Sequence, residues 1–387
     1  MSPPDAAAGR YRSLRACRAV AAILLVCFHL SDNLAKDKFF GHDADVLVRI
    51  FALGGQARVA FFFVLSGFII TLIHRQDFGV PGRLLPYLCR RATRIYPTYV
   101  LVFACVYLGS LAVPSLREGL PTGLGVLVKS LFLLPQDPAV VGGTGAPVIY
   151  VAWSLQYEMV FYGVVGLGIL HRRLFVGAVA MYMANLAWQL HGGSESFPGS
   201  FFANDLLLLF GIGAATAWVV AQDWRMPRPV PVAIVAGVLF FGFGAVAEAL
   251  DGGLPLPLVH LGYGLFAAML IVALVQAEQR EPGRFGNRFA AVVGDASYAL
   301  FLIHFPLLAL LSKAAVAAGL HGVGGMLVSF VLILASCIAA SVAFHQWIER
   351  PLLKGLAPRA PSKPKAPDMV SVLATPRPHE AAGAARR

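Results

Sequence analysis

Ten long apolar runs recur along the chain and restrict what it can fold into. They lie at residues 19–31, 57–74, 96–113, 153–170, 174–190, 201–221, 229–249, 256–277, 293–312 and 324–347. Most are long enough for a helix to cross about 30 Å of hydrocarbon. A backbone in hydrocarbon must satisfy its own hydrogen bonds, so each run predicts a helix. We therefore expect an all-α polytopic membrane protein with ten transmembrane helices.

The composition excludes a water-soluble domain, because 58% of the 387 residues are hydrophobic and only 13% are charged. The first run is short and follows several arginines, as in a secretory signal peptide. However, Ser31, Asp32 and Asn33 lead into a charged loop where a signal peptide would have a small-residue cleavage site. We therefore interpret this run as a helix of the mature protein.

Lysine and arginine are distributed unevenly between the two sides of the ten-helix arrangement. The side that holds both termini carries 24 of them, and the other side carries 7. This bias predicts that both termini are cytoplasmic. The same bias, together with attraction to anionic membrane lipids, accounts for the net charge of +11, so no nucleic-acid partner is expected.

The chain divides into two parts by composition. Residues 1–355 form the predicted membrane domain, and residues 356–387 are rich in proline, alanine and basic residues, which predicts a disordered cytoplasmic tail. The five cysteines show no paired spacing that suits a disulfide framework or a zinc site, so no metal is expected.

His29 lies inside the first run, eleven positions after Arg18, which places both side chains on one helix face about 16 Å apart along the axis. An ionisable group in hydrocarbon is costly and often marks a functional path. The alternative is a histidine that only supports helix packing. His304, within the ninth run, allows the same two interpretations: it lines a shared cavity or bonds a neighbouring helix.

A cluster of arginines, Arg90, Arg91 and Arg94, precedes the third run on the predicted cytoplasmic side. The charge alone favours simple anchoring at the membrane interface. The more specific hypothesis is an anion site, because guanidinium groups bind phosphate oxygens with two parallel hydrogen bonds. Such a site would hold a phosphorylated donor, for example a nucleotide or coenzyme A.

The fourth run begins with Trp153, Ser154, Tyr157 and Glu158 and enters from the outer side. Glu158 is then about one turn inside the membrane, at a level that we expect to match that of His29. A carboxylate bonded to one imidazole nitrogen fixes the tautomer and leaves the other nitrogen free to accept a proton. The alternative is that the aromatic residues form an interfacial belt and Glu158 lies near water.

Several of these segments, in this order, resemble the acyltransferase 3 family of integral membrane proteins, which O-acylate bacterial surface polysaccharides and other exported acceptors. The resemblance spans about residues 11–355 and rests on Arg18 with His29, FFFVLSGFII at 61–70, RRATRIYP at 90–97, WSLQYEMVFY at 153–162, SYALFLIHFP at 297–306 and the closing Glu349, Arg350 and Pro351. The exopolysaccharide acetyltransferase branch is the most similar. The chain departs from the family at Ala19, where a glycine often follows the arginine.

The resemblance implies roles for these residues. His29 would be the catalytic base, with Arg18 supporting it and Glu158 orienting or polarising it. The arginine cluster would bind acyl-CoA. We also expect a substrate cavity that is lined by Trp153, Ser154, Tyr157 and His304.

The implied reaction moves an acyl group, by default acetyl, from cytoplasmic acyl-CoA to a hydroxyl of an exported carbohydrate acceptor, in the bacterial inner membrane. Acetyl-CoA is then the donor and no metal takes part. Transfer is either direct or through an acyl-histidine intermediate, and the sequence leaves both open.

Two other classes of function remain possible from the sequence. A ten-helix proton-coupled transporter or flippase would use His29 and Glu158 as a proton relay, although no repeated halves are evident. A structural subunit of a polysaccharide export complex would need no catalytic geometry.

Overall fold

The computed structural model describes residues 11–52, 57–113, 117, 119–193, 196–222, 224–250, 253–285 and 287–356. Within these ranges every regular element is helical. The long helices are α2 (Arg12–Leu34), α4 (Ala57–His74), α5 (Leu84–Ala112), α9 (Trp153–Leu170), α10 (Arg172–Leu190), α12 (Leu206–Val220), α13 (Pro229–Ala249), α14 (Leu256–Arg280), α16 (Ser297–Ala317) and α17 (Gly322–Phe344). Apart from Leu356, the predicted tail lies outside the described residues.

Short helices connect the long ones. They are α3 (Asp45–Ala52), α7 (Leu124–Leu131), α8 (Pro138–Val141), α11 (Gly199–Phe202), α15 (Arg288–Asp295) and α18 (Arg350–Leu356). Three short 3₁₀ turns, η1 (Gly41–Ala44), η2 (Pro81–Arg83) and η3 (Tyr150–Ala152), and one π-helical turn, η4 (His345–Glu349), complete the fold.

All ten predicted ranges fall on a long helix, which confirms the all-α fold. In the part of the chain that is described, seven helical segments are long and apolar enough to cross a membrane. Helix α4 is apolar but shorter, and α9 and α10 are not among the seven. The number of ten crossings and the cytoplasmic position of the termini stay predictions.

Two of the predicted boundaries that differ from the structure affect the candidate site residues. Helix α5 begins at Leu84, twelve residues before the predicted start, so the arginine cluster lies on the helix and not in a loop before it. Arginine is a good helix former, and its long side chain can extend toward water from within a membrane helix. The predicted ninth helix, 293–312, is interrupted, because α15 ends at Asp295 and α16 begins at Ser297.

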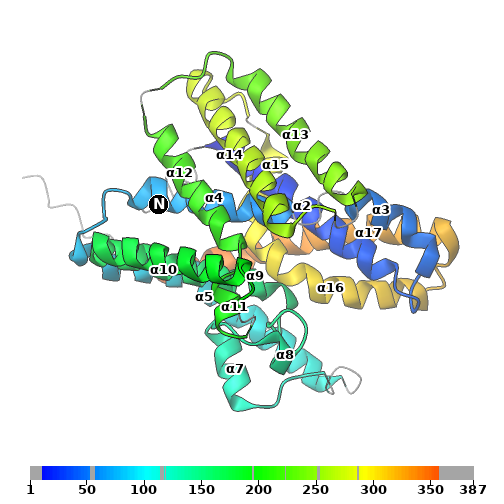
Figure 1. Ribbon diagram of the computed structural model, residues 1–387. Helices are drawn as coiled ribbons and strands as arrows, with labels where there is room; N and C mark the ends of the chain where they lie inside the picture. Colours follow the sequence, from blue (N-terminus) through cyan, green and yellow to red (C-terminus); the bar gives the residue numbers. More distant parts are fainter. Residues whose placement is uncertain are drawn as a thin grey trace, which may run out of the picture.

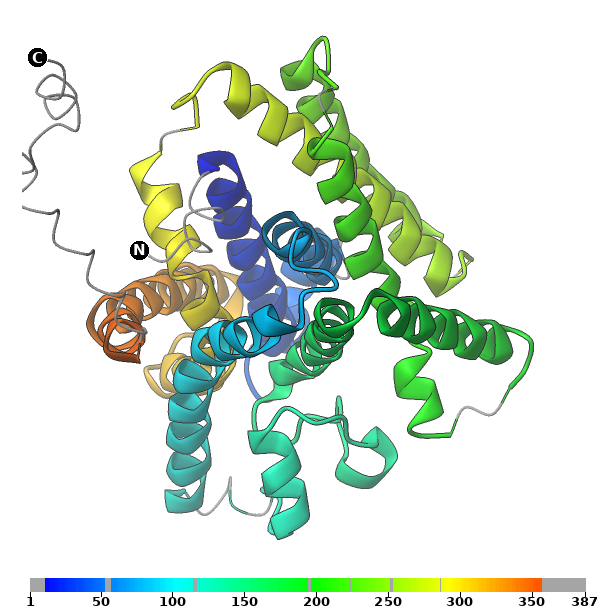
Figure 2. The ribbon, with the colours of Figure 1, turned by 90° about the vertical axis from the view of Figure 1, so that its left-hand side faces the viewer.

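Helix α2 lies in the middle of the bundle. It contacts α4, α14, α15, α16 and α17, and it runs between α14 and α15 in Figure 2. One of these contacts is very close, because a Cβ atom added to Gly294 in α15 would lie 2.4 Å from the Arg15 carbonyl oxygen. Residues that face inward from α2 therefore meet side chains from both ends of the chain.

Helices α4 and α12 cross even more closely (Figure 1). A Cβ atom at Gly67 would lie 2.2 Å from the Phe210 carbonyl oxygen, and one at Gly213 would lie 2.0 Å from that of Val64. Small residues at such crossings let the two backbones approach each other, which is how helices associate in membranes.

Segments predicted to be cytoplasmic meet one another at one end of the bundle. The Arg12 amide, at the start of α2, donates to the Glu278 carboxylate near the end of α14 (2.7 Å). The Gly79 amide, in the loop after α4, donates to the Gly168 carbonyl near the end of α9 (3.0 Å). Both contacts fit helices that alternate in direction, as the prediction requires.

Candidate active site

Arg18 lies at the centre of a group of charged residues. Its Nη2 donates to Ser297 Oγ (2.8 Å), at the first residue of α16. It is also within electrostatic range of Glu158, Arg94 and Glu349. Three helices and the C-terminal π-turn therefore bring charged side chains together at the level of Arg18.

Arg94 is held between an aromatic ring and a buried carboxylate. Its guanidinium carbon lies 5.7 Å from the centre of the Tyr298 ring, and its Nη1 lies 3.8 Å from the Glu349 carboxylate. Glu349 is completely buried and also bonds His345 Nδ1 (2.7 Å). The π-turn η4 places Glu349 against Arg94 of α5. Arg94 therefore points inward, toward Arg18.

Arg91 takes a different direction from Arg94. Its guanidinium carbon lies 5.8 Å from the centre of the Tyr162 ring. The Nε atoms of Arg91 and Arg90 are both buried and have no hydrogen-bond partner among the described residues. The three arginines of the predicted anion site thus lie on one helix, but Arg91 and Arg94 contact different neighbours.

Glu158 accepts hydrogen bonds from two hydroxyl groups on its Oε1 atom. The donors are Ser66 Oγ from α4 (3.2 Å) and Tyr162 OH, one turn along α9. Because Glu158 is in electrostatic range of Arg18, these contacts place it at the level of the arginines. Its predicted pairing with His29 stays a prediction.

His29 lies about three helical turns from Arg18 along α2. Its ring centre is 5.4 Å from that of His304 and 5.6 Å from that of Phe305, both on α16. His304 is completely buried, and its Nδ1 donates to the Leu300 carbonyl (2.9 Å). The structure therefore brings together the two histidines that the sequence placed in separate runs.

The other predicted cavity residues pack against their surroundings. Tyr157 stacks on Phe201 with 4.4 Å between ring centres, and Trp153 meets the Tyr157 ring edge to face at 6.0 Å. Ser154 Oγ donates to the Val151 carbonyl (3.3 Å). These contacts pack the three residues at the start of α9, and their place in a substrate cavity stays a prediction.

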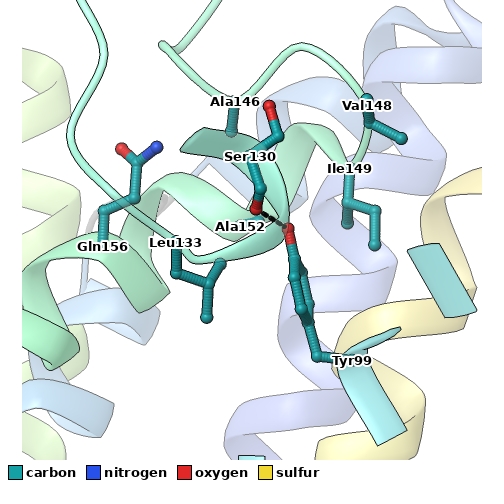
Figure 3. Close-up of a pocket in the computed structure, with 8 residues that line it drawn as sticks. All are labelled: Tyr99, Ser130, Leu133, Ala146, Val148, Ile149, Ala152 and Gln156. Atoms are coloured by element: carbon teal, nitrogen blue, oxygen red, sulfur yellow. Dashed lines mark hydrogen bonds between the residues drawn. The ribbon is translucent and has the colours of Figure 1, made fainter. Parts of the chain in front are cut away.

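A small pocket lies between α5, the start of α9 and the segment 130–152 (Figure 3). Tyr99 donates to the Ser130 carbonyl across it (2.7 Å), and Gln156 donates to the Gly145 carbonyl (3.0 Å). The space inside does not admit a water molecule. These hydrogen bonds hold the segment against the bundle. The pocket is too small to bind substrate.

Sequence reasoning gave no site role to four residues that contact the predicted ones. Ser66 and Ser297 are serines in apolar surroundings, and His345 and Glu349 lie at the end of the last apolar run. The available signal for Ser66, Ser297 and Glu349 was their position inside the family segments FFFVLSGFII, SYALFLIHFP and the closing Glu-Arg-Pro, whereas His345 lies outside these segments. In the described part of the chain, no group of three potential ligands is placed to hold a metal ion.

The candidate site residues lie at two levels along α2, one around Arg18 and the other around His29. One level carries arginines and carboxylates, suited to binding an anionic group. The other carries two imidazoles in apolar surroundings, suited to accepting and returning a proton.

Comparison with known proteins identifies relatives. The model of the acyltransferase 3 family, described as an acyltransferase domain, matches residues 11–346. The exopolysaccharide production protein ExoZ of Rhizobium meliloti (strain 1021) is 29% identical over 304 residues, which cover 78% of this chain and 90% of ExoZ. YrhL of Bacillus subtilis (strain 168), named as a candidate peptidoglycan O-acetyltransferase, is 24% identical over 374 residues, which cover 87% of this chain and 54% of YrhL. No solved structure matches.

Proposed function

Because this chain belongs to the acyltransferase 3 family, we propose that it is a membrane-embedded O-acyltransferase that transfers an acyl group, by default acetyl, from acyl-CoA to a hydroxyl of an exported carbohydrate. The donor binds on the cytoplasmic side, and the acceptor arrives from the other side of a bacterial inner membrane. The names of the two relatives, which refer to an exopolysaccharide and to peptidoglycan, support a carbohydrate acceptor.

The observation that carries this proposal is the pair of levels along α2. Arg18, with the arginines of α5, lies at one end, and His29, against His304, lies about three turns away. Arg91 and Arg94 hold the phosphates of coenzyme A, and the pantetheine arm extends toward His29. The acyl group thereby reaches the acceptor while coenzyme A stays on its own side.

In the direct reaction, His29 removes the proton of the acceptor hydroxyl as its oxygen attacks the thioester carbonyl carbon. A new C–O bond forms, the C–S bond breaks, and the departing thiolate takes the proton back from the imidazolium. Atoms and charge balance without a further reactant. If instead a His29 nitrogen attacks first, an acyl-histidine forms and the kinetics are ping-pong.

The test measures transfer of radiolabelled acetyl from acetyl-CoA to the host polysaccharide in membranes. Loss of a general base costs about 10²- to 10⁴-fold in rate, so we expect His29→Ala to lower transfer by this amount at equal protein level. The double variant Arg91→Ala with Arg94→Ala should raise the KM for acetyl-CoA. Arg173→Ala, at an exposed arginine in the first turn of α10, is the matched control and should leave transfer unchanged.

Two results would contradict the proposal. Full transfer of acetyl by the His29→Ala variant would show that His29 is not the catalytic base. Transfer by the wild type that never exceeds that of empty membranes, together with loss of acyl-independent export in His29→Ala, would favour the transporter or flippase.

A further inference from the structure

The two ring nitrogens of His304 differ in their contacts. Nδ1 has a hydrogen-bond partner, and Nε2 has none among the described residues. A carbonyl oxygen only accepts hydrogen bonds, so the contact with Leu300 requires a proton on His304 Nδ1. His304 Nε2 is buried and has no hydrogen-bond partner among the residues described. Buried polar atoms are nearly always paired, so an unpaired one in a completely buried side chain calls for an explanation.

The group next to His304 is the imidazole of His29. The two ring centres are 5.4 Å apart with 32° between their planes, a separation at which the rings are in contact. Phe28 and Phe305 lie against His29 at 5.1 and 5.6 Å, and Phe305 in turn stacks on Tyr150 at 4.8 Å. Aromatic rings thus restrict how the His29 ring can turn.

We propose that His304 is a positioning residue for His29. A small turn of the His29 ring lets His304 Nε2 accept a hydrogen bond from one His29 nitrogen, with or without substrate bound, and the other His29 nitrogen then takes the hydroxyl proton. The proposal rests on the function proposed above, and it gives His304 the orienting role that the sequence predicted for Glu158.

An imidazole suits this position better than a carboxylate. The orienting partner of a catalytic histidine is often an aspartate or glutamate. An unpaired carboxylate deep in an apolar bundle is costly, whereas a neutral imidazole accepts the same hydrogen bond without a charge. Glu158 lies instead near the arginines, where Ser66 and Tyr162 already bond it.

Three substitutions separate positioning from packing. His304→Gln keeps a polar group near the place of Nε2. His304→Asn keeps a polar group only near Nδ1, and His304→Phe keeps the ring without nitrogens. Changing a residue that orients a ligating or reacting side chain costs about 10- to 100-fold. We therefore expect kcat to fall by this factor in the Asn and Phe variants, with KM for acetyl-CoA unchanged, and to recover largely in the Gln variant.

A double variant tests whether His304 acts through His29. If it does, adding His304→Phe to His29→Ala should cause no further loss of transfer, because residues that act as a unit are not additive. Full kcat in the Phe variant, or equal loss in the Gln, Asn and Phe variants at equal amounts of folded protein, would overturn the positioning role. Either result would leave the proposed function standing, since wild-type transfer and His29→Ala test that separately.

A measurement independent of activity is the ¹⁵N spectrum of histidine-labelled protein in bilayers, with the His29 resonances identified by their loss in His29→Ala. We expect His304→Phe to shift the His29 ring nitrogens, and both His304→Gln and the exposed control His321→Phe to leave them near their wild-type positions. Unshifted His29 resonances in His304→Phe would refute the proposal even in a protein that transfers no acyl group.

Discussion

At the scale of single residues, the site depends on buried charged side chains that form ion pairs or hydrogen bonds. Glu349 is completely buried and serves both His345 and Arg94. A buried carboxylate is tolerated only where cations or donors surround it. The two contacts that the Glu349 carboxylate makes therefore explain how a charge so close to the membrane interior can persist, and why Arg94 faces Arg18.

We expect Glu349→Gln to destabilise the protein by about 1.5–3 kcal/mol, because a hydrogen bond to a charged group is lost and Arg94 loses its counter-charge. Thermal unfolding of the purified protein in detergent measures the change. Glu281→Gln is the control: that carboxylate is 62% exposed and pairs with Arg284, so its loss should change stability by less than about 0.5 kcal/mol. Equal effects of the two substitutions would show that Glu349 is not held by its pairs.

Glu158 lies between two hydroxyl groups and the arginines. Tyr162→Phe removes one of the two donors to its carboxylate and keeps the ring against Arg91. We expect the acyl-transfer rate to fall several-fold while KM for acetyl-CoA stays within about twofold, since the ring contact with Arg91 is kept. Steady-state transfer assays at varied acetyl-CoA check this, and a large rise in KM with unchanged kcat would contradict it.

At the scale of elements, close helix crossings hold the bundle together. Gly67 in α4 and Gly213 in α12 leave no space for a side chain, because backbone atoms occupy the place of a Cβ. Backbone cannot move aside as a flexible side chain does. The α4–α12 crossing therefore requires glycine at both positions, and it fixes Ser66 beside Glu158.

We expect Gly213→Ala to destabilise the protein by about 1–3 kcal/mol or to prevent its accumulation, because overpacking forces the two backbones apart. The matched control is Gly211→Ala, two residues earlier on α12, where an added Cβ meets nothing within 4 Å. Protein yield and melting temperature in detergent should fall for Gly213→Ala only. A wild-type melting temperature for both variants would show that the crossing is looser than described.

At the scale of the whole molecule, segments that were predicted to be cytoplasmic from their lysine and arginine content lie in contact with one another. The arginine-rich start of α10 lies against the loop after α4, where Arg172 Nε donates to the Phe78 carbonyl (3.3 Å). Both segments were predicted to be cytoplasmic. The crossing of α9 and α10 stays a prediction, because neither helix is among the seven candidate spans.

Cysteine labelling in intact cells tests the topology, using single cysteines in a background without the native ones. We expect a membrane-impermeant maleimide to label Lys36→Cys directly, and Arg284→Cys and Arg173→Cys only after permeabilisation, since lysine and arginine are concentrated on the cytoplasmic side. Labelling of Arg173→Cys alone in intact cells would mean that α9 and α10 do not cross. Labelling of Arg284→Cys in intact cells would show that the orientation is the reverse of the predicted one.

Apolar runs and charged residues are local properties of the chain, and they were enough to predict the helices and the candidate site residues. Which of these residues meet depends on the tertiary structure. Arg18 and Ser297 are 279 positions apart, and His29 lies against His304 on α16. The structure also places the arginine cluster on α5. Periodicity and hydropathy report a residue's preference for lipid or water, whereas a contact between helices depends on how closely their backbones approach, as at Gly67 and Gly213.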